Sequence, residues 1–196
     1  MTTAVVKLGV GNTASVMFAL DRLGAPAVLT DDAMQIAEAE RVILPGVGAA
    51  AHAMRLLRDK GLRDVLVHFA RPLLGICLGQ QLLYESSEEG DAEGLGVIPG
   101  RVERLPASQQ TPAPHMGWSR LSVAGAHPLL DGVADGAYAY FVHSYVCPLG
   151  PQTIADASYG QRFSAVVAQG NMFGCQFHPE RSGSAGAGIL RNFLAL

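Results

Sequence analysis

The sequence is poor in lysine and in charge of either sign. Lysine occurs only twice among 196 residues, charged residues make up 16%, and the formal net charge is −3. The arginines are scattered, so no basic run predicts nucleic acid or an anionic membrane surface as a partner. Met1 is not followed by a basic and then an apolar segment, so no secretory signal is expected. Arg71, Gln80 and His143 interrupt the longest apolar stretches, so no membrane span is expected.

Cysteine is scarce as well. The chain has three, Cys77, Cys147 and Cys175, an odd number at spacings that match no zinc motif. A disulfide scaffold is therefore not expected, and a reducing cytoplasm is the expected location. Histidines other than His178 form no set with metal-ligand spacing, so we assign no metal. These histidines are His52, His68, His115, His127 and His143.

Hydrophobic residues make up 49% of the chain, which is enough for a sizeable core. Over the first half, strand-like runs alternate with helical periodicity. Strands are predicted at residues 4–8, 27–30, 41–44 and 72–76, the third ending at Pro45-Gly46. Helices are predicted at residues 13–23, 49–58, 62–69 and 78–87. This alternation predicts an α/β fold, with a mostly parallel sheet covered by helices on both faces.

After Gly90 the pattern changes to short β-like runs separated by proline and glycine. These runs lie at residues 100–105, 118–123, 138–147, 153–157, 165–168 and 172–177. We expect them to add antiparallel strands at one edge of the sheet, with a closing helix at residues 186–196. No repeat, low-complexity segment or linker divides the chain, so residues 1–196 are expected to form one domain.

A candidate nucleophile lies between a predicted strand and a predicted helix. Gly75-Ile76-Cys77-Leu78-Gly79 has the form of a nucleophile elbow with cysteine in place of serine. Such a turn strains the backbone and needs small neighbours. It also places the sulfur at a helix N-terminus, which favours thiolate, and turns the amide of Leu78 toward a developing oxyanion. From the pentapeptide alone, a buried structural role for Cys77 is as well supported as a catalytic one. Cys147 and Cys175 lack glycine neighbours, and the structural interpretation is preferred for both.

A thiol nucleophile needs a base, and the base needs a group to orient it. Gln176-Phe177-His178-Pro179-Glu180 supplies both. In extended backbone, His178 and Glu180 would share a face, and Pro179 keeps the residue before it extended. The histidine and carboxylate together with the cysteine elbow predict a Cys-His-Glu triad.

A competing motif follows the first strand. The segment Gly9–Ala14 fits the glycine fingerprint of dinucleotide-binding proteins, and Asp31 and Asp32 follow about 20 residues later. The chain leaves little room for a substrate domain beside such a unit. A tight glycine turn that opens the first helix is the preferred interpretation.

Gly75-Ile-Cys-Leu-Gly-Gln-Gln81 and His178-Pro-Glu180 together resemble the signature of class I glutamine amidotransferases. Further motifs in chain order resemble one branch of that family, the glutaminase subunits of imidazole glycerol phosphate synthase. They are Gly9-x-Gly-Asn12, Leu44-Pro-Gly-Val-Gly-Ala49, Ala53-Met54, Pro114-His-Met-Gly-Trp118, Tyr140-Phe-Val-His-Ser-Tyr145 and Gln176-Phe-His-Pro-Glu-Arg-Ser-Gly183.

The resemblance implies a flavodoxin-like α/β fold and hydrolysis of L-glutamine to L-glutamate and ammonia, without a cofactor. It also implies a heterodimer with a (βα)₈-barrel cyclase subunit. That cyclase would use the ammonia to form imidazole glycerol phosphate and AICAR in histidine biosynthesis.

The resemblance also assigns roles by position. Three residues match the triad, as nucleophile, base and orienter: Cys77, His178 and Glu180. Three match backbone positions that face the oxyanion, two of them in a strand whose backbone reorients before it does so: Val47, Gly48 and Leu78. Four match residues that hold glutamine, two by side chain and two by backbone: Gln81, Glu89, Ser144 and Tyr145. Two match residues near the subunit interface and ammonia exit: Trp118 and Tyr140.

The chain departs from the family's usual residues at positions outside the triad. These are Lys7, Leu8, Thr13, Ala50, Gln80, Ser119 and Val146. Glutaminases of anthranilate, aminodeoxychorismate or pyridoxal phosphate synthesis usually differ from Pro45-Gly-Val-Gly48 and lack the His115-Met-Gly-Trp118 run. A catalytically idle binding subunit is the alternative from another class, and the complete Cys-His-Glu set argues against it.

Overall fold

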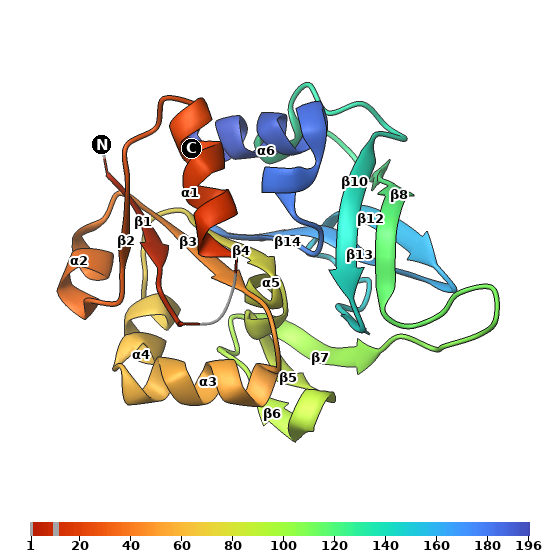
Figure 1. The fold of residues 1–196 in the computed structure, drawn as a ribbon, viewed down its shortest axis with the longest axis horizontal. Coiled ribbons are helices and arrows are strands. Elements are labelled where there is room, and N and C mark those ends of the chain that lie inside the picture. The colour runs from red at the N-terminus through yellow and green to blue at the C-terminus, as the bar shows by residue number, and fades with distance from the viewer. Residues whose placement is uncertain (1, 10–11) are drawn as a thin grey trace.

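The computed structural model describes residues 2–9 and 12–196. Its first half alternates strands and helices around a central sheet (Figure 1). The strands of this half are β1 (Thr3–Val6), β2 (Ala27–Thr30), β3 (Arg41–Gly46) and β4 (Leu73–Cys77). The helices are α1 (Thr13–Arg22), α2 (Ala33–Glu38), α3 (Ala50–Asp59) and α4 (Leu62–Val67). All four strands run parallel, as the alternation predicted.

The central sheet has eight strands in the order β2-β1-β3-β4-β14-β13-β12-β9. Its second half consists of β14 (Met172–Cys175), β13 (Gln161–Gln169), β12 (Thr153–Tyr159) and β9 (Ser122–Val123). In Figure 1, α1 and the C-terminal helix α6 (Gly183–Ala195) cover one face of the sheet, while α3 and α4 cover the other. A separate apolar cluster fills each interface. The predicted α/β fold with helices on both faces of a mostly parallel sheet is confirmed.

Two smaller sheets complete the structure. One contains β11 (Tyr145–Val146), β7 (Ile98–Arg104), β5 (Tyr84–Ser87) and β6 (Ala92–Glu93). The other pairs β8 (His115–Arg120) with β10 (Tyr138–His143) in antiparallel fashion. Three short 3₁₀ turns are described, η1 (Glu89–Asp91), η2 (Pro128–Leu130) and η3 (Pro179–Arg181).

The prediction that all late strands add antiparallel at one edge was wrong in two respects. β13, β12 and β9 do so, but β14 runs parallel to β4, and β7, β8, β10 and β11 lie in the smaller sheets. Strand direction and sheet membership depend on partners distant in sequence, which a local pattern does not report.

Three local predictions also differ from the structure. The helix expected at residues 78–87 ends early: α5 spans Leu78–Leu82, and Tyr84–Ser87 instead pairs with β7 and β6. Strand β3 does not stop before Pro45, because Pro45 and Gly46 both pair with β4. Helix α2 was not predicted, although Asp32 caps it by accepting hydrogen bonds from two backbone amides, at 2.8 and 3.0 Å.

Candidate active site

The elbow is built by the end of β4 and the start of α5. Cys77 has φ 55° and ψ −110°, a conformation that side chains rarely adopt. A Cβ atom at Gly79 would overlap the carbonyl oxygen of Leu44, and one at Gly75 would overlap the carbonyl oxygen of Gly79. The two glycines are therefore a steric requirement of the turn, and they leave Cys77 at the carboxyl end of a buried strand.

The candidate base reaches the elbow through the neighbouring strand. β14 runs parallel to β4 with Cys175 opposite Ile76, so the chain that follows β14 leaves the sheet beside Cys77. His178 is extended, with φ −97° and ψ 95°, as Pro179 predicted. The extended backbone expected beyond it was wrong, because residues 179–181 form the turn η3.

The turn η3 brings Glu180 back to the imidazole. Nδ1 of His178 lies 2.9 Å from Oε1 of Glu180, and only 11% and 1% of the two side chains are exposed. Ser182 holds the turn: its hydroxyl donates to the carbonyl of His178 at 2.7 Å and accepts from the amide of Tyr140 at 2.9 Å. Because a carboxylate oxygen only accepts, Nδ1 carries a proton and Nε2 remains for the sulfur.

Charge at His178 depends on its partners. Burial opposes protonation, but hydrogen bonds and electrostatic attraction from Cys77 and Glu180 outweigh it and raise the pKa of His178 to about 10. An imidazolium held between a thiol sulfur and a carboxylate is the charge arrangement that a cysteine nucleophile requires.

A cavity of about 430 Å³ opens above the elbow, within the size range of small-molecule sites. Its walls contain every predicted catalytic, oxyanion and substrate-binding residue except Glu180, which lies behind the imidazole. These residues are Val47, Gly48, Cys77, Leu78, Gln81, Glu89, Ser144, Tyr145 and His178. Trp118 and Tyr140 are not part of the lining. The structure therefore gathers residues from five separate segments around one thiol.

Two of the gathered side chains already have protein partners. Glu89 accepts a hydrogen bond from the amide of Ala50 at 2.8 Å, at the start of α3, and burial raises the pKa of Glu89. Gln81 donates through Nε2 to the carbonyl of Tyr145 at 2.9 Å and to the side-chain oxygen of Gln176 at 3.0 Å. Gln81 is thus oriented before any ligand binds.

Known proteins resemble the chain over nearly its whole length. The family described as Glutamine amidotransferase class-I matches residues 9–196. A protein of Xylella fastidiosa (strain Temecula1 / ATCC 700964) named imidazole glycerol phosphate synthase subunit HisH is 51% identical over 193 residues, covering 98% of this chain and 96% of the relative. The chain belongs to the class I glutamine amidotransferase family.

A second HisH protein supports the same branch for this amidotransferase. The protein from Idiomarina loihiensis is 48% identical over 196 residues, covering 100% of this chain and 98% of the relative. A solved structure described as a glutamine amidotransferase aligns with a TM-score of 0.76 at 23% identity, covering 98% of this chain and 97% of the other, and supports the fold. The family predicted from the motifs is confirmed.

The sequence did not single out several residues that line the amidotransferase cavity or lie next to its thiol. Val142 places its carbonyl 3.6 Å from the sulfur of Cys77, and Gln176 places Nε2 3.9 Å from it. Ala49, Pro114 and His143 also line the cavity. All five belong to motifs on which the family resemblance rests, so a signal was present, but a motif does not say which of its residues faces the thiol.

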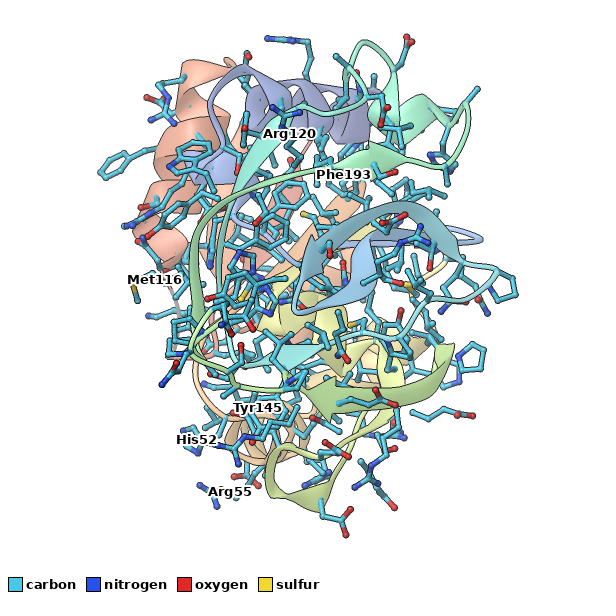
Figure 2. The ribbon with its side chains drawn as sticks, turned by 90° about the vertical axis from the view of Figure 1, so that its right-hand side faces the viewer. His52, Arg55, Met116, Arg120, Tyr145 and Phe193 are labelled. Atoms are coloured by element: carbon cyan, nitrogen blue, oxygen red, sulfur yellow. The ribbon has the colours of Figure 1, made fainter. Side chains whose placement is uncertain are left out.

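The proposed interface residues lie outside the cavity lining, on the outer sheet formed by β8 and β10. Trp118 of β8 and Tyr140 of β10 are paired in register, and their rings meet edge to face at 5.7 Å. Trp118 is 54% exposed and Met116 is 64% exposed. In Figure 2, Met116 of β8 lies at one edge of the molecule and projects away from the ribbon.

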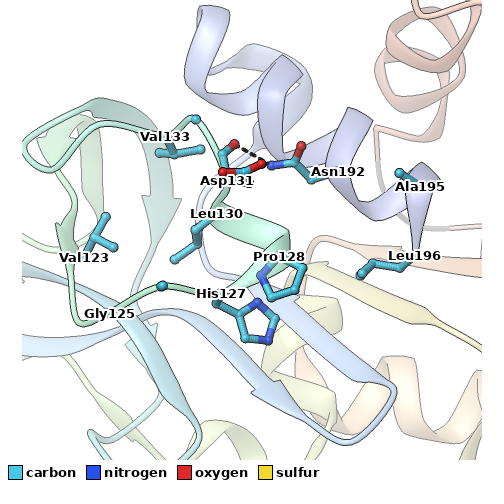
Figure 3. A pocket seen from close by; sticks show the side chains of 12 residues that line it. Val123, Gly125, His127, Pro128, Leu130, Asp131, Val133, Asn192, Ala195 and Leu196 are labelled. Atoms are coloured by element: carbon cyan, nitrogen blue, oxygen red, sulfur yellow. Dashed lines mark hydrogen bonds between the residues drawn. The ribbon is translucent and has the colours of Figure 1, made fainter.

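A larger cavity, of about 780 Å³, contains none of the predicted site residues (Figure 3). It lies beside the C-terminal helix, where Asn192 donates to the carbonyls of Leu129 and Asp131. Its lining brings together no thiol and base, so its size alone marks no reaction centre.

The competing dinucleotide motif receives little support. Val10 and Gly11 lie outside the described residues. Asp32 caps α2, and Asp31 pairs with Lys60 at 2.6 Å.

Within residues 2–9 and 12–196, no three side chains of histidine, cysteine, aspartate or glutamate cluster in a way that could hold a metal ion. No helix in that part of the chain has the length and hydropathy to cross a membrane.

Proposed function

We propose that this amidotransferase hydrolyses the side-chain amide of L-glutamine through Cys77, His178 and Glu180, yielding L-glutamate and ammonia. The observation that carries the proposal is the convergence of a strained thiol and a carboxylate-oriented imidazole on one cavity. Proteins named HisH, which are 45–51% identical, support glutamine as the substrate class.

In the first half of the reaction, the Cys77 thiolate attacks the amide carbon. The oxygen of that carbonyl becomes negative and accepts hydrogen bonds from the amide of Leu78 and from an amide of Val47 or Gly48. The protonated His178 gives its proton to the leaving nitrogen, so ammonia departs and a γ-glutamyl thioester remains.

In the second half, His178 removes a proton from water, and the oxygen of that water attacks the thioester carbon. The C–S bond breaks, glutamate leaves, and the thiolate–imidazolium pair is restored. Glu180 keeps one proton on Nδ1 throughout, so Nε2 faces the reaction in both halves. Gln81, Glu89 and the backbone of Ser144 and Tyr145 hold the amino-acid end of glutamine.

The ammonia is passed to a cyclase subunit with a (βα)₈ barrel, which forms imidazole glycerol phosphate and AICAR in the cytoplasm. The HisH relatives are named as subunits of imidazole glycerol phosphate synthase. The exposed side chains of Met116 and Trp118, with Tyr140 beside them, supply an apolar surface for such a partner. Ammonia released into neutral water is mostly protonated and no longer nucleophilic, so a protected path between subunits has a chemical reason.

A three-part assay tests both parts of the proposal. Glutamine hydrolysis is measured for the purified chain alone, with the cyclase, and with the cyclase and its nucleotide substrate. Gly46 and Gly48 flank Val47 and let that peptide rotate at low cost. We propose that partner binding uses this rotation to complete the oxyanion donor. We expect slow hydrolysis alone and an increase of orders of magnitude in the full mixture, since one such donor is worth roughly 3–4 kcal/mol. Full activity of the isolated chain would refute its activation by the cyclase. No glutamine hydrolysis in any of the three mixtures would refute the proposed glutaminase activity.

A further inference from the structure

Two buried histidines outside the triad face each other in the outer sheet. His115 of β8 and His143 of β10 are direct cross-strand partners. Only 2% and 6% of them are exposed, and Nδ1 of His115 lies 3.0 Å from Nε2 of His143. The glutaminase reaction as described uses neither ring, although His143 lines the cavity.

One carbonyl sets the direction of every hydrogen bond in this pair. Nδ1 of His143 lies 2.8 Å from the carbonyl oxygen of Tyr145, which only accepts, so Nδ1 carries the proton. Nε2 of His143 must then accept from Nδ1 of His115. Nε2 of His115, in turn, accepts from the hydroxyl of Ser119 at 2.9 Å. We call this ordered set Ser119, His115, His143 and the Tyr145 carbonyl the histidine relay.

The rings of the relay have little freedom to reorient. His115 is stacked between Phe141 and Tyr159, with ring centroids 4.9 and 4.0 Å away. Burial lowers the pKa of His115 to about 4. Burial also lowers the pKa of His143 to about 3; the hydrogen bond to Tyr145 opposes this shift, and the charges of His115 and His178 add smaller lowering contributions. Both rings are therefore neutral near pH 7, and each has one donor and one acceptor in use.

The inner end of the relay meets the glutamine cavity. The Tyr145 carbonyl that accepts from His143 also accepts from Nε2 of Gln81 at 2.9 Å. Gln81 continues to the side-chain oxygen of Gln176, and Gln176 places its nitrogen 3.9 Å from the sulfur of Cys77. The carbonyl of Tyr145 is thus the shared acceptor of the relay and of the side-chain network beside the nucleophile.

The outer end of the relay lies in the exposed part of β8. Ser119 follows Trp118 directly and is half-buried, whereas His115 four residues earlier is fully buried. The relay therefore spans from the outer sheet to the cavity wall through groups that are all hydrogen-bonded.

We infer that His115 and His143 are positioning residues for glutamine hydrolysis: the relay holds the Tyr145 carbonyl, and through it Gln81, in the orientation that receives glutamine. The inference rests on the proposed function. Among the described residues the relay makes no hydrogen bond to the thiol or to the imidazole of the base, so its loss affects the binding of glutamine more than the chemical step. Losing one neutral hydrogen bond of this network corresponds to a rise in KM of roughly 5- to 30-fold, with kcat changed less than threefold.

Two substitutions at one position separate the relay from simple packing. In His143→Asn the amide nitrogen replaces Nδ1 and keeps the donor to Tyr145, but the contact with His115 is lost. In His143→Gln the amide lies where Nε2 was, so the contact with His115 is kept and the donor to Tyr145 is lost. Both are measured in the complex with cyclase and its ligand, beside His68→Gln on the exposed end of α4 as the matched control.

We expect KM for glutamine to rise more in His143→Gln than in His143→Asn, and to stay within twofold of wild type in His68→Gln. Ser119→Ala, which removes only the outer donor, should raise KM by about twofold to fivefold. Equal KM values for the two His143 variants, with wild-type turnover normal, would overturn the relay. No glutamine turnover by the wild-type complex would overturn the proposed function itself, and this inference with it.

A spectroscopic measurement on the wild-type chain does not depend on the folding of any variant. Nitrogen-15 spectra of the imidazoles should report the Nδ1–H tautomer for both His115 and His143 at every pH from 5.5 to 8. An Nε2–H tautomer or a protonated ring at either relay position would overturn the assignment.

Discussion

The glutamine cavity has a histidine on each of two sides, and the two are in opposite states. On one side, His178 lies between a thiol and a carboxylate, and its pKa is raised to about 10. On the other, His143 lies between an imidazole and a carbonyl, and its pKa is lowered to about 3. Both side chains are buried. Burial alone thus produces a neutral histidine, and only a partner that is or becomes anionic reverses it. The first side is suited to moving protons and the second to holding a shape.

Removing the thiol tests the reactive side most severely. We expect Cys77→Ala to lower glutamine hydrolysis by at least ~10⁴-fold, because Cys147 and Cys175 are buried and do not line the cavity, and loss of a triad nucleophile has this magnitude. Ammonia-supported synthesis by the cyclase should persist, which shows that the complex is still assembled. Undiminished glutaminase activity would mean that the elbow is only structural. Cys175→Ala, at a buried thiol one strand away, is the matched control.

Replacing the Glu180 carboxylate weakens the difference between His178 and His143, because His178 loses its anionic partner but is still present as the base. We expect Glu180→Gln to retain roughly 10²-fold more glutaminase activity than His178→Ala, because an orienting group supports the base but does not transfer the proton. Acylation rates with a reactive glutamine analogue measure the order of the two effects. Equal losses would show that Glu180 does more than orient His178.

The two histidine regions should also respond to pH with opposite sign. His178 has a folded pKa above its ordinary value of 6.5, so its contribution to stability is complete below pH 6.5 and is lost as the pH rises toward 10. His115 and His143 have folded pKa values below 6.5, so their contributions are complete above pH 6.5 and are lost as the pH falls toward 4 and 3.

Urea unfolding at a series of pH values measures both slopes, each up to about 1.4 kcal/mol per pH unit for one group. We expect Cys77→Ala to flatten the alkaline slope and His143→Gln to flatten the acid slope. The same flattening of both slopes by either variant would contradict the separation of the two regions.

The smallest expected effect concerns a buried polar group whose partners are incomplete. Gln80 is fully buried and donates to the carbonyl of Ser164 at 3.0 Å, but its Oε1 has no hydrogen-bond partner among the described residues. An unsatisfied buried acceptor costs about 1–3 kcal/mol. We expect Gln80→Met, of similar volume, to raise the free energy of unfolding by about 1 kcal/mol, with glutaminase activity unchanged. Thermal unfolding measures the gain, and a fall in the melting temperature would show that the donated bond matters more.

The fold was predictable where its signals are local. Apolar runs and helical periodicity located β1 to β4 and the helices α1, α3 and α4. The boundary after α5 was not predictable in this way, because Leu83 and Tyr84 suit a helix by local pattern. Tyr84 becomes part of a strand only through its pairing with Ile98. The parallel direction of β14 is likewise decided by β4, which lies far away in the sequence.

The site divides in the same manner. Glycine spacing around Cys77 and the pair His178 and Glu180 are local patterns, and both were predicted. The relay was not, because the contact between His115 and His143 depends on the register of two strands and joins residues 28 apart in sequence. The spacing of histidines along the sequence can indicate a metal site, and here it indicates none. It cannot indicate a hydrogen bond between two neutral imidazole rings.

The pairing of β4 with β14 has a consequence for how activity develops as the chain folds. Cys77 and Gln176, just before the base, contact each other although they are 99 residues apart in sequence. Contacts of such long range form late and slow the folding of a domain. Hydrolysis of glutamine is therefore a reporter of completed folding. The exposed segment 106–110 lies between the two halves. A chain divided there would carry its nucleophile and its base on separate fragments, and activity would return only when the two fragments reassociate.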